Sequence, residues 1–130
     1  MADLTDYFEA EILKWAFQTA SATRPTAWHV GLFTTAPTAD DGTTSAVECS
    51  GSGYSRQSAT FSLSAQTLTL TSALTFGPAT SSWPQVVAFG IWDSPTSGNI
   101  LAFENLTSAR SIGSGDSAEF ATSALTITID

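Results

Sequence analysis

The sequence is poor in the residues on which most metal and redox chemistry depends. It contains one cysteine, Cys49, and one histidine, His29. One thiol cannot form a disulfide within the chain, and it cannot supply the usual ligand set of a cysteine-ligated metal site. We therefore expect no metal and no cofactor.

Positive charge is also scarce. Four Lys and Arg residues stand against twelve Asp and Glu, which gives a formal net charge of −8. Proteins that bind nucleic acid or anionic membranes need clustered cations, so we expect neither partner. No apolar run approaches the length of a membrane span, and the acidic start, Met-Ala-Asp-Leu-Thr-Asp, is unlike a signal peptide. We therefore expect synthesis in the cytoplasm without export.

Serine and threonine fill the polar positions instead of charged residues. Charged residues make up 12% of the chain, about half the usual share. Threonine fits the pleated surface of a β-sheet better than Lys or Glu does. We expect one domain over residues 1–130, with an N-terminal helical segment at 1–24 and a β-sandwich at 25–130.

One segment, from about Asp6 to Thr19, is predicted to be helical. Asp6 and Glu9 fit a capping box, and Pro25 ends the region. Two interpretations stay open, a helix that plugs one end of the β-core and a helix that also packs on a neighbouring subunit. The apolar stripe consists of Leu4, Phe8, Ile12, Trp15 and Ala16, and Leu13 and Phe17 widen it towards a second face.

The rest of the chain has the pattern of an antiparallel β-sandwich of about eight short strands. The run at 85–92 is apolar on both faces, so we expect it to be central and covered on both sides. Jelly-roll and immunoglobulin-like topologies both fit. The predicted strands are 27–34, 54–61, 67–70, 73–76, 85–92, 100–106, 117–120 and 125–129, with a further short segment at 108–112.

A long polar loop at 35–53 joins the first two strands. Loops of this length are usually functional or mobile. Asp40 and Asp41 precede a glycine and fit an ordinary turn, because no spaced calcium ligands follow. The segment 50–53 is glycine-rich but lacks the lysine and the helix of a phosphate-binding loop.

No arrangement of residues predicts catalysis. His29 lies within a strand, where it is more simply a structural residue, and no Gly-x-Ser-x-Gly elbow marks a nucleophile. We expect no enzymatic activity and consider contact surfaces instead. Trp83 lies in a loop, where it either caps the core or anchors a partner. The candidate interface residues are Phe8, Trp15, Trp83, Asp40, Asp41 and Val47.

Several segments together resemble a known family. The chain reads VGLFTTAP at 30–37, SGSGYSRQ at 50–57, FGIWD at 89–93 and GNILA at 98–102, after an N-terminal amphipathic helix. This order resembles the small virion proteins of tailed bacteriophages that are often labelled tail-fibre proteins. The resemblance covers most of the chain and departs from the pattern at Cys49, where a small residue is expected.

The resemblance implies a non-enzymatic structural protein of the virion, assembled in the bacterial host cytoplasm. We expect it to decorate or cement the capsid through protein–protein contacts. A tail or fibre-adaptor component is the first alternative, and a carbohydrate-binding module is the second. Its expected partners are other virion proteins and copies of itself, most simply in a closed trimer.

Overall fold

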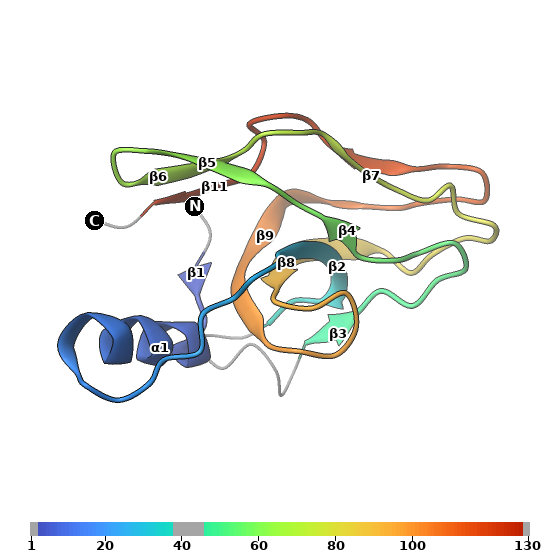
Figure 1. Cartoon of the computed structure of the whole chain (residues 1–130). Coiled ribbons are helices and arrows are strands. Elements are labelled where there is room, and N and C mark those ends of the chain that lie inside the picture. The colour runs from blue at the N-terminus through green and yellow to red at the C-terminus, as the bar shows by residue number, and fades with distance from the viewer. Residues whose placement is uncertain (1–2, 38–45, 129–130) are drawn as a thin grey trace.

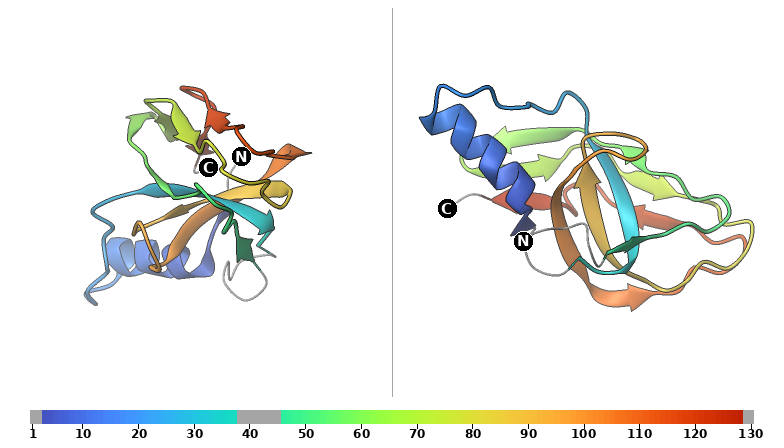
Figure 2. Two further views of the ribbon diagram at one scale, coloured as in Figure 1. Left: turned by 90° about the vertical axis from the view of Figure 1, so that its right-hand side faces the viewer. Right: turned by 90° about the horizontal axis from the view of Figure 1, so that it is seen from below.

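The described part of the chain folds into two packed β-layers with one helix at the end of them (Figures 1 and 2). The computed structural model describes residues 3–37 and 46–128. Every strand pair in it is antiparallel. The predicted fold class, a mainly β sandwich after an N-terminal helix, is confirmed.

The larger layer, sheet A, has the order β1-β9-β8-β2-β3, and β4 also pairs with β2. The second layer consists of the sheets β11-β6-β5 and β10-β7. The strands of sheet A are β1 (Asp3–Leu4), β2 (His29–Thr35), β3 (Val47–Glu48), β4 (Gln57–Ser58), β8 (Val86–Trp92) and β9 (Ile100–Arg110). Those of the second layer are β5 (Phe61–Ser64), β6 (Thr67–Leu70), β7 (Leu74–Phe76), β10 (Ala118–Phe120) and β11 (Thr126–Thr128).

The main core lies between the two layers. Val30 and Leu32 of β2 and Ile91 of β8 face it from sheet A, and Leu70 and Phe76 face it from the second layer. Val30 and Leu32 are two residues apart on β2, which is the alternation that the sequence shows. β8 lies between β9 and β2 and is buried along almost its whole length, so the prediction of a doubly covered central strand is confirmed.

Two predicted strand boundaries are wrong. The segments predicted separately at 100–106 and 108–112 form the single strand β9, which ends at Arg110. The segment predicted as one strand at 54–61 contributes to both layers instead. Its first part is β4, paired with β2, and the chain then crosses to the second layer and continues as β5, paired with β6. The alternating pattern runs through the crossing and therefore does not reveal it.

The helix α1 (Asp6–Phe17) begins one residue away from its predicted cap. Thr5, not Asp6, is the N-cap, because its side chain accepts a hydrogen bond from the Phe8 amide. The helix ends at Phe17, two residues before the predicted end. It lies at one end of the molecule, with the β11-β6-β5 sheet across from it (Figures 1 and 2).

Candidate functional site: an apolar groove beside the helix

The start of α1 is tied to β9 through Thr5, which is buried. The Thr5 hydroxyl donates a hydrogen bond to the Ile100 carbonyl (2.6 Å) and accepts one from the Phe8 amide (3.3 Å). The Thr5 amide donates to the Leu101 carbonyl (3.0 Å). One residue thus caps the helix and fixes the direction in which it leaves sheet A.

The middle of α1 is held by Glu11. Its carboxylate accepts hydrogen bonds from the Lys14 side chain (2.6 Å) and from the Thr23 amide. These two donors, Lys14 first and Thr23 second, hold the pKa of Glu11 below its ordinary value. The carboxylate therefore connects the helix to the segment that returns from it towards β2.

An apolar groove of about 580 Å³, here called the α1 groove, opens between the helix and the second layer. The segment 22–25 and Trp28 complete its rim. The side chains around it come from elements far apart in the sequence, so folding alone brings them together. Its lining includes Phe8, Ile12 and Trp15 from α1, Ile91, Leu101 and Ala102 from sheet A, and Phe61, Leu68 and Ile127 from the second layer.

Large apolar side chains stand exposed around this groove. On α1, Trp15 is 76% exposed, Phe17 82% and Leu13 56%. On the opposite side, Leu63 of β5 is 69% exposed and pairs across the strands with Leu68, which lines the groove. Trp15 and Leu63 thus add exposed apolar area at the groove, and Leu13 and Phe17 add more on the other side of the helix. Exposed apolar area of this kind marks a surface that contacts another molecule.

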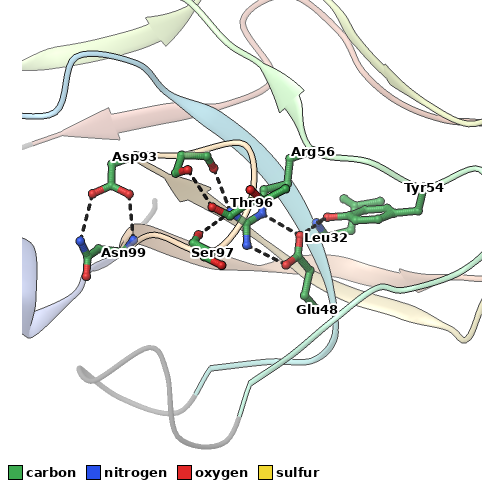
Figure 3. A network of polar contacts seen from close by, with 9 residues as sticks. Leu32, Glu48, Tyr54, Arg56, Asp93, Thr96, Ser97 and Asn99 are labelled. Atoms are coloured by element: carbon green, nitrogen blue, oxygen red, sulfur yellow. Dashed lines mark hydrogen bonds and ion pairs between the residues drawn. The ribbon is translucent and has the colours of Figure 1, made fainter.

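A second notable arrangement lies on sheet A, where Arg56 joins three segments (Figure 3). Its guanidinium donates to both carboxylate oxygens of Glu48 (each 2.8 Å) and to the carbonyls of Ser94 and Ser97 (each 2.8 Å). It also lies over the Trp92 ring, 4.1 Å from the centroid. Only 7% of the Arg56 side chain is exposed. This Arg56 cluster fixes β3 to the β8–β9 turn.

Tyr54 extends the same cluster to β2. Its hydroxyl donates to Glu48 (2.7 Å) and accepts from the Leu32 amide (3.0 Å). Burial of the ring raises the pKa of Tyr54 far above its ordinary value, so the hydroxyl keeps its proton and its role as a donor. Through Leu32 on one side and Glu48 on the other, the cluster fixes the chain on both sides of residues 38–45.

Two glycines let the aromatic side chains pack closely on this face of sheet A. Gly31 and Gly90 pair across β2 and β8. A Cβ atom at Gly31 would lie 2.7 Å from Cζ3 of Trp92, and one at Gly90 would lie 2.7 Å from Cε2 of Phe33. These glycines belong to the VGLFTTAP and FGIWD segments, so the resemblance rests partly on packing around Trp92.

The structure separates the predicted interface residues. Phe8 and Trp15 line the α1 groove together. Val47 is 52% exposed on β3, which is not part of the groove. Asp40 and Asp41 lie outside the described residues. A role in a contact stays a prediction for all of these positions.

Trp83 belongs to the core and not to an exposed surface. Its side chain is 5% exposed, its ring stands edge-on to Tyr54, and its indole nitrogen donates to the Ser52 carbonyl (2.9 Å). Of the two interpretations of Trp83, a cap on the core agrees with this position. The structure contradicts its use as an exposed anchor, because almost none of the ring is accessible.

The remaining candidate groups form no chemical site in the described chain. Across residues 3–37 and 46–128, no three His, Cys, Asp or Glu side chains lie close enough together to hold a metal ion. His29 pairs with Trp92 and Ser58 within sheet A. Cys49 is buried, and this burial raises the pKa of its thiol. In the same part of the chain, no helix is long and apolar enough to cross a membrane.

Sequence reasoning missed the Arg56 cluster and the groove as a whole. Arg56 is one of only four cations in the chain and lies within the SGSGYSRQ segment, which is the one signal that pointed to it. For the groove, the second apolar face of the predicted helix was the one indication in the sequence.

Comparison with known proteins agrees with the resemblance in the sequence. A family model described as podophage GP4 fiber I protein gp80 matches residues 3–128. No curated protein matches the chain. The match spans both β-layers, α1 and every residue of the groove. The chain therefore belongs to the podophage GP4 fiber I protein gp80 family and is a structural component of a bacteriophage virion.

Proposed function

We propose that this protein is a non-enzymatic subunit of the phage tail fibre and that it works through contacts with other virion proteins. The observation that carries the proposal is the apolar groove with its exposed rim, in a chain whose family is described as a fibre protein. An exposed apolar surface of this kind is costly in water unless a partner covers it.

The polar groups favour a structural role over a catalytic one. Arg56, Glu48 and Tyr54 form the densest polar arrangement, and their hydrogen-bonding groups are directed at one another. A catalytic group must instead face a space that a substrate enters. The groove is lined mainly by apolar side chains, and its one carboxylate, Glu11, is held by Lys14 and Thr23.

Several copies of the chain are expected to act together in a closed symmetric assembly. Closed rotational symmetry is the usual outcome when a protein associates with itself. The chain has a low content of charged residues, so a contact between copies requires the desolvation of few charges. The assembly would then meet other virion proteins as one unit.

Location on the particle tests the proposal. Antibodies raised against the purified chain, bound to intact virions and viewed by electron microscopy, should label the tail. Labelling spread evenly over the capsid would contradict the tail assignment. Boiled particles, in which every virion protein is exposed, serve as the control for antibody access.

Capsid decoration is the second candidate, favoured by the compact two-layer architecture. A cement protein needs a compact body and contact surfaces that reach adjacent capsid subunits. Here the Arg56 cluster fixes the chain on both sides of residues 38–45, and Val47 is exposed beside it. The same labelling experiment distinguishes this candidate, because a decoration protein should give antibody label over the whole capsid.

A further inference from the structure

We infer that the α1 groove of one copy receives the C-terminal end of α1 from a second copy of this chain. The inference rests on the proposed role in protein–protein contacts and names the partner for the groove. It is tested on the purified protein, so its failure would leave the proposed place in the virion untouched.

The last two turns of α1 have the character of a buried helix. Trp15 lies on the side of the helix that lines the groove, whereas Leu13 and Phe17 are one turn apart on the other side. All three are more than half exposed. A helix that is apolar on both sides is normally enclosed by protein, so this end of α1 is suited to insertion into another surface.

The α1 groove has the shape and chemistry to receive that helix end. Its volume of about 580 Å³ lies in the range of ~300–1,000 Å³ in which clefts enclose a bound group. Phe61 and Leu68 form its far wall, and Leu63 stands exposed beside them. Each copy therefore carries a protruding apolar end and an apolar cavity, which allows two copies to pair reciprocally.

The exposed area is sufficient for a stable contact between copies. At the usual areas of their residue types, the four exposed apolar side chains around the groove offer about 550 Å² per copy. Two copies together then bury about 1,100 Å² from these side chains alone, above the ~1,000 Å² that a specific interface needs. The groove lining adds to this area.

The first test measures mass in solution at high micromolar concentration, by light scattering coupled to size exclusion. The wild-type chain should have a multiple of the monomer mass, and the double variant Leu13→Ser, Phe17→Ser, whose side chains do not line the groove, should be monomeric. Because both side chains are largely exposed, the melting temperature of the variant should stay near that of the wild type. Val47→Ser, which removes an exposed apolar side chain outside the groove, should leave the mass unchanged.

A complementation test distinguishes this arrangement from non-specific association of exposed apolar side chains. Ala22→Trp places a bulky ring in the groove wall and should also give a monomer, although the helix end is intact. Mixing the two monomeric variants combines one intact helix end with one intact groove, and a species of twice the monomer mass should form. A monomeric wild type, an assembly that survives either variant, or a mixture that stays monomeric would overturn the inference.

Discussion

Replacing Arg56 by alanine should destabilise the protein more than any surface substitution. Arg56 donates to both oxygens of Glu48 and to two carbonyls, and it stacks on Trp92. Alanine would leave the Glu48 carboxylate with the Tyr54 hydroxyl as its one remaining partner in the cluster. The substitution also removes the packing of the guanidinium on the Trp92 ring.

The size of the effect follows from the burial of the pair. Removing one partner of a buried ion pair costs about 3–5 kcal/mol, because the remaining charge loses its compensation. The Arg56 side chain is 7% exposed, but that of Glu48 is 29% exposed and water will partly solvate it. We therefore expect a loss near the lower limit, about 3 kcal/mol, which for a domain of this size lowers the melting temperature by about 10 °C.

Urea denaturation followed by tryptophan fluorescence measures this loss, because Trp92 lies within the cluster. Arg56→Lys should retain the charge but lose the bidentate contact with Glu48. Its free energy of unfolding should therefore lie between those of the wild type and Arg56→Ala. Arg110→Ala is the matched control, since Arg110 is exposed at the end of β9. A loss below about 1 kcal/mol for Arg56→Ala, similar to that of an exposed ion pair, would refute the reasoning.

Three further predictions follow from the packing, the charges and the aromatic residues. Gly31→Ala should destabilise the fold by about 1–3 kcal/mol, because the added methyl meets the Trp92 ring, and an unchanged urea midpoint would contradict this. The pKa of Glu11 is lowered in the folded state, so the contribution of its carboxylate to stability is present above its ordinary pKa of 4.5 and is lost as the pH falls further. On acidification, the melting temperature of Glu11→Gln should therefore fall less than that of the wild type. An equal fall in the two melting temperatures would argue against the contact. Soluble glycans should leave tryptophan fluorescence unchanged, since Trp83, the loop tryptophan that could have offered a sugar-binding ring, is buried. Saturable quenching would instead favour a carbohydrate-binding module.

The sequence predicted the elements whose pattern is local. β6 has the predicted bounds 67–70, and β8 is the central strand, because two-residue alternation and continuous apolar runs depend on neighbouring residues alone. The cap of α1 was misplaced by one residue, because Asp6 and Glu9 also fit a capping box, and both signals are local. The hydrogen bond from the Thr5 hydroxyl to the Ile100 carbonyl, which also fixes this end of the helix, joins positions 95 residues apart. No local pattern reports such a contact.

The sites were harder to predict than the strands. The α1 groove combines side chains from a helix, from sheet A and from the second layer, so it exists only once the layers are packed. The sequence indicated Phe8, Trp15 and the second apolar face of the helix, but not the opposite wall at Phe61 and Leu68. The sequence left two interpretations of Trp83 open, because it lies in a loop between a serine and a proline, and in the structure that loop folds back over the core.

We propose that this chain is a structural subunit of the phage tail fibre. Its copy number in purified virions, measured by quantitative mass spectrometry against the major capsid protein, tests that claim most directly. A small number of copies per particle, in a multiple of three, is the expected result. Absence from the particle, or a count close to that of the major capsid protein, would contradict it.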